Sequence, residues 1–156
     1  MEAERAAARV VLLDEHGRVY LLEAADERGR WWFTPGGGRE AGESDIDCAR
    51  RELAEETGYR VDASALAGPI FEEVMEPSPG RVEVRQRQVF FAARVAAGAA
   101  GDERGWTEIE TRVIKGARWW TIEELEQTRD AVYPVQLAEL ARVALTILRP
   151  APPAAG

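Results

Sequence analysis

A glycine-rich turn followed by a short helix with clustered glutamates is the feature that most constrains this chain. The segment Gly37–Tyr59 reads GGREAGESDIDCARRELAEETGY. Ser44 is suited to cap a helix N-terminus, and Asp47 three residues later completes a capping box. Gly58 favours the left-handed backbone at which many helices end. We therefore predict a helix that begins after Ser44 and ends at Gly58.

The predicted helix separates a core-facing side from an acidic one. At about 100° per residue, the core-facing side collects Ile46, Ala49, Leu53 and, at its edge, Thr57. A different arc collects glutamates at spacing i, i+3 and i+4, which are neighbours on a helix surface: Glu52, Glu55 and Glu56. Like charges at this spacing destabilise a helix by about a few tenths of a kcal/mol per pair, so the cluster calls for a counter-charge.

A divalent metal ion would relieve this crowding of carboxylates. Arg51 could neutralise one glutamate, but a hard cation takes oxygen ligands from several at once. Mg²⁺ fits best, because it binds a few carboxylates and keeps water or phosphate oxygens as its other ligands. The preceding run Pro35–Gly38 predicts a turn without side chains, where a backbone carbonyl can approach the metal closely. The alternative, an acidic run on a solvated helix face, explains neither the glycines nor the Arg51-Glu52 pair.

These residues resemble the Nudix box, G-x5-E-x7-R-E-U-x-E-E-x-G-U, in which U is a bulky aliphatic residue. Tyr59 stands at the last position, where Ile, Leu or Val is usual, and it is still bulky and apolar. The flanks are similar too, with a Trp-rich segment before Pro35 and the stretch Trp119–Leu125. The resemblance implies the α/β Nudix fold, a mixed β-sheet between helices (α/β/α). The other fixed positions are occupied by Gly37, Glu43, Arg51, Glu52, Leu53, Glu55, Glu56 and Gly58.

The resemblance also implies roles for the matching residues. The three helix glutamates would bind Mg²⁺, or Mn²⁺ in its place, with the carbonyl of Gly36 as an additional ligand. Glu43 and Arg51 would orient the ligand carboxylates. The family hydrolyses a nucleoside diphosphate linked to another group X, by attack of water on a phosphorus atom of the pyrophosphate. The metal would activate that water and neutralise charge on the phosphate oxygens.

The general base is less firmly fixed by the sequence. The resemblance points to a late-loop glutamate, Glu108 or Glu110, as an extra metal ligand or base, although a solvated loop charge explains either residue equally well. His16, the only histidine, lies in a turn-like segment, so we do not expect a histidine base. Cys48, the only cysteine, is expected to be a small helix residue without a catalytic role. Proton removal would then fall to a glutamate.

Composition limits the classes of protein that remain. The 156 residues suffice for one domain, expected over residues 1–149, with a disordered Pro/Ala-rich tail at 150–156. The net charge of −8 argues against stable nucleic-acid binding, which requires a basic face, but not against a small polyphosphate that arrives with Mg²⁺. One cysteine, no recognisable signal peptide and no long apolar run predict a cytoplasmic protein without a membrane partner.

The remaining chain alternates predicted strands and helices, which is typical of an α/β/α sandwich. Thr121 and Glu124 form a second capping box at the start of a short helix. A last helix over 135–148 would bury Leu137, Leu140, Ala141, Ala144 and Leu148. A turn is expected at 77–80 and a glycine-containing loop at 96–112. Strands are expected at 9–13, 18–23, from 60, at 68–75, 81–95 and 118–120.

Four residues are candidates for substrate contacts. Arg85 and Arg87 fall on one side of the strand 81–95 and could bind a polyphosphate through their guanidinium groups. The solvent face of an edge strand explains them slightly better. Trp31 or Trp32 could stack on a base, and one of the two is expected in the core.

The sequence therefore favours a Mg²⁺-dependent pyrophosphatase, with a nucleoside triphosphate or dinucleoside polyphosphate as its substrate. One alternative is a non-hydrolytic Nudix-like domain that senses a nucleotide, although such a domain would be expected to have lost box glutamates. The other is an RNA 5′-end pyrophosphohydrolase, which would need a basic rim from Arg28, Arg30, Arg85 and Arg87. The resemblance also makes a homodimer an expectation.

Overall fold

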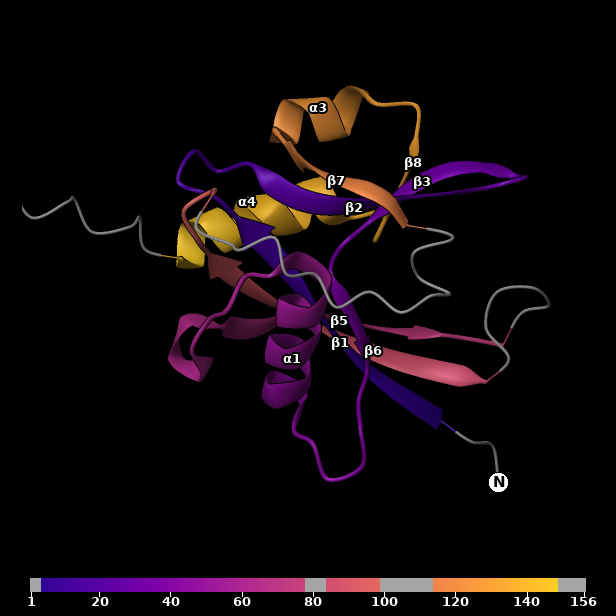
Figure 1. Ribbon diagram of the computed structural model, residues 1–156, viewed down its shortest axis with the longest axis vertical. Helices are drawn as coiled ribbons and strands as arrows, with labels where there is room; N and C mark the ends of the chain where they lie inside the picture. Colours follow the sequence, from indigo (N-terminus) through magenta and orange to yellow (C-terminus); the bar gives the residue numbers. More distant parts are fainter. Residues whose placement is uncertain (1–3, 78–83, 99–113, 149–156) are drawn as a thin grey trace, which may run out of the picture.

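In the computed structural model, which describes residues 4–77, 84–98 and 114–148, a mixed sheet of eight strands carries helices on both faces (Figure 1). The strand order is β5-β6-β1-β2-β3-β8, while β4 pairs with β1 and β7 pairs with β2. The strands are β1 (Glu4–Leu13), β2 (Val19–Asp26), β3 (Gly29–Phe33), β4 (Gly36–Gly38), β5 (Ala67–Met75), β6 (Arg85–Arg94), β7 (Ile114–Trp120) and β8 (Ala131–Tyr133). The helices are α1 (Asp45–Thr57), α3 (Ile122–Gln127) and α4 (Leu137–Ile147), with a 3₁₀ turn at Ala63–Ala65.

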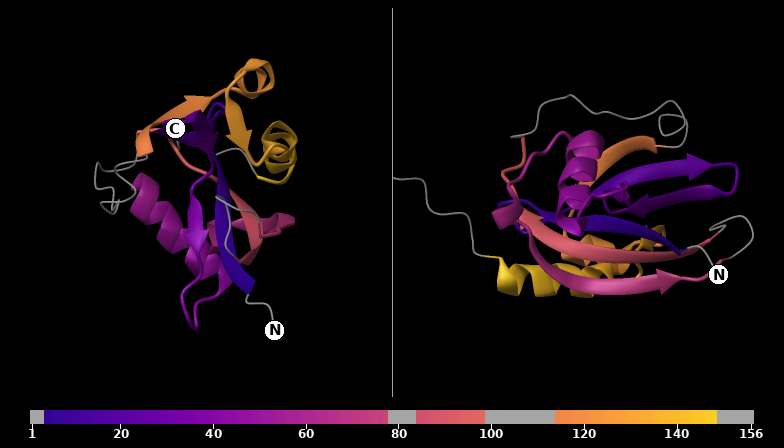
Figure 2. Two further views of the ribbon diagram at one scale, coloured as in Figure 1. Left: turned by 90° about the vertical axis from the view of Figure 1, so that its right-hand side faces the viewer. Right: turned by 90° about the horizontal axis from the view of Figure 1, so that it is seen from below.

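Strand β1 organises the sheet because it pairs with three others. It runs parallel to β6 from Glu4 to Leu13 and antiparallel to β2 and β4. Successive side chains of β1 point to opposite faces of the sheet and pack into two separate cores. Val10 lies in the core under α1, whereas Val11 lies in the core under α4. The two helices therefore cover opposite faces of the sheet (Figure 2), which confirms the predicted α/β/α arrangement.

Helix α1 begins and ends where its capping residues predict. The Ser44 side chain accepts a hydrogen bond from the Asp47 backbone N–H at 3.1 Å. Gly58 adopts φ +81° and donates its backbone N–H to the Ala54 carbonyl at 3.0 Å. Ala49 and Leu53 are fully buried, which confirms the predicted core-facing side. The acidic side is thereby turned toward β4.

Most of the other predicted elements are present, and some are longer than expected. The first two strands form a hairpin around a turn in which Gly17 has φ +76°. The capping box of Thr121 and Glu124 forms at the start of α3. The last predicted helix is α4, and it buries Leu137, Leu140, Ala141 and Ala144. Among the described residues, no helix is long and apolar enough to cross a membrane.

Two expectations are wrong, and one strand was not foreseen. The segment at 60–61 is not a strand; the chain there leads into the 3₁₀ turn at 63–65. The run Gly36–Gly38 is not a turn but strand β4, because its backbone pairs with Ala7–Arg9 of β1. Strand β8 was not expected, since three residues carry too little pattern to be recognised. The predicted turn at 77–80 and loop at 96–112 lie largely outside the described residues, and the predicted tail lies wholly outside them.

Candidate functional site

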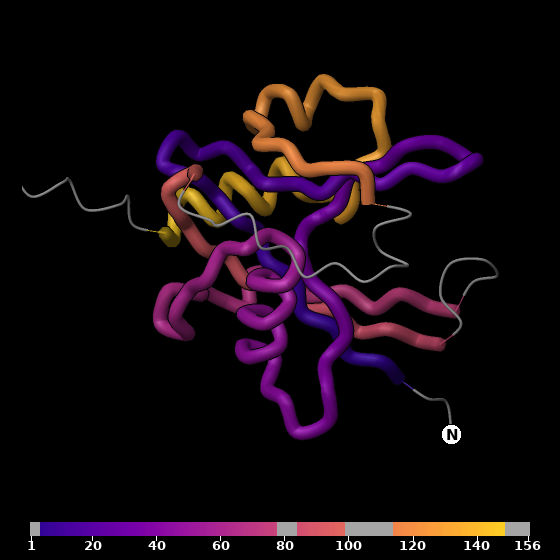
Figure 3. Tube along the Cα trace, viewed as in Figure 1, coloured from indigo at the N-terminus to yellow at the C-terminus, as the bar shows by residue number. Residues whose placement is uncertain are grey.

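The glutamate-bearing side of α1 lies against strand β4. Figure 3 shows the chain leaving β4, turning at the end of a long loop and returning as α1. Gly36 donates its backbone N–H to Glu56 Oε1 at 3.1 Å. A Cβ atom on Gly37 would lie 2.6 Å from the carboxylate carbon of Glu52. Two of the three predicted glutamates are therefore seated directly on the glycine strand.

The glycines are required here for two different reasons. Gly36 has φ +154°, and a Cβ atom there would lie 2.5 Å from the Ala8 carbonyl oxygen, so both its conformation and its surroundings exclude a side chain. Gly37 has no such backbone constraint. Its absent side chain leaves the space that the Glu52 carboxylate occupies. Gly36 and Gly37 therefore hold two carboxylates against a paired strand, and the run is not a flexible turn.

Arg51 ties this region together through its guanidinium group. Its Nε and Nη2 atoms donate to the two carboxylate oxygens of Glu43, at 2.8 and 3.0 Å. Its Nη1 donates to Glu52 Oε1 at 3.0 Å and to Glu55 Oε2 at 3.4 Å. Its Nη2 also donates to the Gly38 carbonyl at 3.0 Å. One planar cation thereby orients three carboxylates and fixes them to β4, the geometry for which arginine is suited.

The Arg51–Glu43 pair strongly perturbs the protonation of both partners. The hydrogen bonds from Arg51 lower the pKa of Glu43 to about 2, and burial opposes this only in part. The hydrogen bonds to Glu43 likewise raise the pKa of Arg51 above its usual value, with Glu52 adding to the effect. Both groups are therefore charged throughout the physiological range, so the pair holds its geometry across that range.

The surroundings of Glu56 raise the pKa of its carboxyl group, whereas those of Glu43 lower it. Only 3% of the surface of Glu56 is exposed, and this burial raises its pKa to about 9 in the metal-free protein. The positive charge of Arg9 opposes the shift, while the nearby Glu52 adds to it. Burial removes the water that would stabilise the ionised carboxylate. Such a buried position is expected for a carboxylate that binds a positive charge, and not for one on a solvated helix face.

Arg9 is a charged residue near the glutamates that the sequence analysis did not single out. It lies on β1, where its Nε donates to Gln88 Oε1 at 2.8 Å and its Nη1 donates to the Thr34 carbonyl at 3.1 Å. Burial lowers its pKa, and the charges of Glu56 and Glu52 work against that shift. Its one signal in the sequence is a lone arginine at the start of the apolar run Val10–Leu13.

The residues present suit a divalent metal ion by the chemistry of their donors. Glu52, Glu55 and Glu56 offer hard carboxylate oxygens, and Gly36 offers a backbone carbonyl on the adjoining strand. In the described part of the chain, however, no three acidic, thiol or imidazole side chains form a ready-made metal cluster. Arg51 holds Glu52 and Glu55 instead, so the metal ligands stay a prediction.

Three of the four predicted substrate contacts, Trp32, Arg85 and Arg87, bond to acidic side chains other than the three glutamates of α1. Trp32 is the core residue of the tryptophan pair and donates its Nε1–H to Asp130 Oδ2 at 3.0 Å, while Trp31 is half-buried. Arg85 lies 3.3 Å from Glu76, and Arg87 donates to Glu72 at 2.8 Å. Strand β6, which carries both arginines, lies between β5 and β1, so the interpretation as an edge strand is wrong. No structural observation assigns any of the four to a substrate.

The remaining predictions concern groups away from the glutamates or beyond the described residues. His16 is exposed in the first hairpin turn, as expected. Cys48 is fully buried and donates its thiol to the Gly37 carbonyl at 3.4 Å, and burial raises its pKa to about 11. It is therefore an unreactive packing residue at neutral pH. Glu108 and Glu110 lie outside the described residues.

Replacing Gly37 by alanine should displace Glu52. The new Cβ atom would lie 2.6 Å from the Glu52 carboxylate, so that side chain must leave its seat. If the glutamates hold a catalytic metal, we expect kcat/KM to fall about 10- to 100-fold, the range seen when the support of a metal ligand is removed. Gly116→Ala is the matched control, because its Cβ would have only an ordinary contact, 3.8 Å from Glu23. Equal activity of the two variants would contradict the view that Gly37 is needed to leave space for the Glu52 carboxylate.

Comparison with known proteins identifies the family to which this chain belongs. The family model of the NUDIX domain matches residues 3–140. An octanoyltransferase from Myxococcus xanthus is 35% identical over 102 residues, which cover 60% of this chain and 27% of that protein. This chain therefore spans little more than a quarter of the length of that relative.

Two solved structures show the same fold. An Ap4A hydrolase from C. elegans, in a binary complex, aligns with a TM-score of 0.64 and 16% identity, over 91% of this chain and 98% of that one. The NUDIX domain of Shewanella oneidensis NrtR, complexed with ADP ribose, aligns with a TM-score of 0.62 and 21% identity, over 93% of this chain and 90% of that one. With the family model matched across most of its length, the chain belongs to the NUDIX domain family.

Proposed function

We propose that this protein is a Mg²⁺-dependent pyrophosphatase that hydrolyses a nucleoside diphosphate linked to another group. The observation that carries the proposal is the set of carboxylates that Arg51 and the glycine strand hold together. Glu52, Glu55 and Glu56 would hold the metal, with the Gly36 carbonyl as a further ligand. Mn²⁺ is the alternative ion, because its ligand preferences are similar.

Different residues of the chain would position the carboxylates and remove the proton of the attacking water. When bound, the ion supplies Lewis-acid stabilisation of the phosphate oxygens and a more acidic water. Arg51 and Glu43 keep the carboxylates in position, so their geometry does not have to be reached anew in each turnover. The Gly36 N–H fixes the Glu56 carboxyl group. A glutamate takes the proton of the attacking water, since His16 lies in the first hairpin turn and Cys48 is buried and protonated.

The favoured substrate is a nucleoside triphosphate or a dinucleoside polyphosphate. The similar fold of the Ap4A hydrolase supports a dinucleoside polyphosphate, while the NrtR domain with ADP ribose supports a nucleotide-like ligand in general. Of the four arginines expected to form a basic rim for an RNA 5′ end, three lie beside acidic side chains, which counts against that substrate: Arg30 beside Glu23, Arg85 beside Glu76 and Arg87 beside Glu72. The expectations of a homodimer and of a cytoplasmic location stay predictions.

A substrate screen with Mg²⁺ tests the proposal. The panel would contain nucleoside triphosphates, oxidised nucleotides, dinucleoside polyphosphates, nucleotide sugars and capped RNA. We expect one class to be hydrolysed, and we expect Glu55→Gln to lower kcat by at least about 100-fold, because a metal ligand loses its charge. Glu126→Gln is the control, since Glu126 is an exposed partner of Arg142 on the far side of the sheet.

Two results would decide against the proposal. Turnover that persists unchanged in Glu55→Gln would remove the glutamate cluster from the reaction. Tight nucleotide binding without any hydrolysis across the panel would favour a nucleotide-sensing domain instead.

A further inference from the structure

Arg9 packs on the glycine that holds Glu56. Arg9 of β1 and Gly36 of β4 are directly opposite partners in the sheet. A Cβ atom on Gly36 would lie 2.4 Å from Arg9 Cγ, so the arginine side chain passes over this glycine. The backbone N–H of Gly36 donates to Glu56 Oε1 at 3.1 Å. One residue of β4 therefore contacts both the arginine and a buried glutamate of the site.

The charge of Arg9 acts on two of the three helix glutamates. Burial lowers the pKa of Arg9, and the charges of Glu56 and Glu52 oppose that shift. Burial raises the pKa of Glu56, and the charge of Arg9 is the largest influence in the other direction. Because such interactions weaken with distance, the guanidinium group lies close to the carboxylates of the site.

Arg9 and Glu52 approach β4 from opposite faces. Arg9 occupies the side of Gly36 from which a Cβ atom would project. Glu52 occupies the corresponding side of the next residue, Gly37, and successive residues of a strand project to opposite faces. Glu56 lies at the backbone edge between these faces, where it accepts the N–H of Gly36. A group bound at this edge can therefore contact the glutamates from one side and Arg9 from the other.

Neutral oxygen atoms hold the Arg9 guanidinium in place. Its Nε donates to Gln88 Oε1 at 2.8 Å, and its Nη1 donates to the Thr34 carbonyl at 3.1 Å. The Gln88 amide nitrogen donates in turn to Glu73, its direct partner across β5 and β6, which fixes the amide oxygen toward Arg9. In the part of the chain that the structure describes, no carboxylate forms an ion pair with Arg9. The guanidinium is therefore oriented while its charge stays available.

Arg51 and Arg9 are thus used differently. Arg51 donates to three carboxylates of the site, whereas the hydrogen bonds of Arg9 go to an amide and a backbone carbonyl. A second cation beside the proposed Mg²⁺ site repels the metal, so support of metal binding does not explain it. An anion that binds together with the metal does explain it, because that anion adds negative charge to the site. A guanidinium group matches the oxygen geometry of a phosphate and can donate two parallel hydrogen bonds to it.

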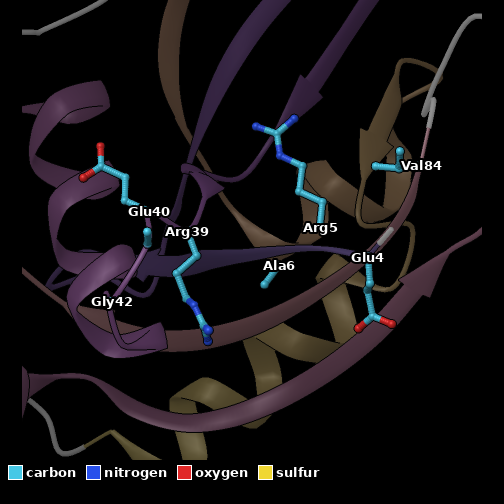
Figure 4. Close-up of a pocket in the computed structure, with 8 residues that line it drawn as sticks. Glu4, Arg5, Ala6, Arg39, Glu40, Gly42 and Val84 are labelled. Carbon is cyan, nitrogen blue, oxygen red and sulfur yellow. The ribbon is translucent and has the colours of Figure 1, made fainter. Parts of the chain in front are cut away.

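We infer that Arg9 binds a non-bridging oxygen of the substrate's pyrophosphate group at the edge of β4. This inference rests on the proposed function, because it assigns a partner to the anhydride on which the glutamate site would act. The contact is made by the N–H groups that Gln88 and Thr34 do not use. The cavity of about 390 Å³ between the start of β1 and the segment 39–42 is not part of it, since Arg9 does not line that cavity (Figure 4). Arg9 is thus a substrate-binding residue and not a support of the metal ligands.

Binding of Mg²⁺ alone and of methylenediphosphonate, a pyrophosphate analogue that is not hydrolysed, tests this inference. Calorimetry would compare the wild type with Arg9→Met and Arg9→Lys, first with Mg²⁺ and then with the analogue at saturating Mg²⁺. We expect Arg9→Met to bind Mg²⁺ as tightly as the wild type or more tightly, because a repelling charge is lost. We expect it to bind the analogue about 10- to 100-fold more weakly, because charge-assisted hydrogen bonds are lost. Arg9→Lys should keep part of the affinity for the analogue.

Arg94→Met is the matched control. Arg94 lies on β6, and its guanidinium donates to two neutral carbonyl oxygens, that of Asp14 at 3.0 Å and that of Glu15 at 3.2 Å. The variant therefore loses the same charge and the same kind of hydrogen bond beside the first hairpin turn. It should bind both probes as the wild type does. If Arg9→Met is too unstable to measure, Arg9→Gln provides the same comparison with a polar side chain.

The outcomes separate this inference from the proposed function. Weaker Mg²⁺ binding in Arg9→Met would overturn the inference, because Arg9 would then support the glutamates. Unchanged binding of the analogue, or an equal loss in Arg94→Met, would also overturn it. The proposed function is decided independently by the turnover of Glu55→Gln. Arg9-dependent binding of the analogue in a protein that hydrolyses no substrate would support the phosphate contact and count against the enzyme.

Discussion

Glu56→Gln should make the metal-free protein more stable while it abolishes turnover. Burial raises the pKa of Glu56 to about 9, against a usual value of 4.5. The unfolded chain therefore releases a proton that the folded protein retains between these two pH values. A glutamine avoids that cost and still accepts the hydrogen bond that Gly36 donates. We expect a gain of about 1–3 kcal/mol in the free energy of unfolding near pH 7.5.

The sign of the pH dependence follows from the raised pKa. For a group whose folded pKa is raised, its contribution to stability is complete below the unfolded pKa of 4.5. It is then lost as the pH rises toward the folded value of about 9. The wild-type protein in EDTA should therefore lose stability from pH 5 to pH 9, and Glu56→Gln should lose less. Urea unfolding at several pH values in that range measures both.

Metal should reverse this order of stability. A cation that binds only the folded protein stabilises it by mass action, and under the proposed function the wild-type site should bind Mg²⁺ more tightly than the variant does. Glu126→Gln serves as the control, because it makes the same substitution at an exposed glutamate of α3. Parallel pH profiles of wild type and Glu56→Gln in EDTA would contradict the prediction. They would mean that Glu56 is ionised in the metal-free protein.

Arg51→Lys should damage both the site and the fold, although it keeps the charge. The lysine ammonium cannot reproduce the two parallel bonds to Glu43 together with those to Glu52 and Gly38. We expect kcat/KM and Mg²⁺ affinity to fall about 10- to 100-fold. We also expect the free energy of unfolding to fall by about 1–3 kcal/mol, since charged hydrogen bonds in a partly buried site are lost.

A titration of Glu43 provides a readout that does not depend on activity. Its pKa of about 2 lies below the usual 4.5, so its contribution to stability is present above pH 4.5 and is lost as the pH falls toward 2. In Arg51→Lys the pKa of Glu43 should move back toward its usual value, which NMR of the side-chain carboxyl carbon measures in metal-free protein. Arg50→Lys is the control on the same helix, because Arg50 donates its Nε–H to the Val61 carbonyl instead. If the pKa of Glu43 stays near 2 in Arg51→Lys, the two hydrogen bonds from the Arg51 guanidinium group are not the cause of the low pKa.

The sequence was sufficient to recognise the site, but not to predict all of its contacts. The spacing of Glu52, Glu55 and Glu56 depends only on the helical period, and the helix ends depend on Ser44 and Gly58, so local rules suffice for them. Glu43 and Arg51 were assigned as a pair by resemblance, and the structure places them in direct contact. Each of these features lies within one continuous segment of the chain.

Contacts between distant segments could not be derived in this way. The glycine run was expected to be a turn, yet its pairing with Ala7–Arg9 makes it a strand, because a backbone without side chains can lie flat against β1. The interpretation of Arg85 and Arg87 as residues of an edge strand was wrong for a similar reason. The order of strands in a sheet is decided by pairing, not by alternation along one strand.

The sequence by itself determined the helix of glutamates, its caps, and the division of α1 into a core-facing side and an acidic side, because each follows from periodicity and residue type over about 20 neighbouring positions. Only the tertiary structure decided which of those carboxylates is buried. Glu56 lies under Gly36 beside Arg9, and that arginine comes from a strand 47 positions earlier in the chain, as the residue numbers show. Burial and charge pairing are properties of the surroundings in space, and no local pattern of residues contains them.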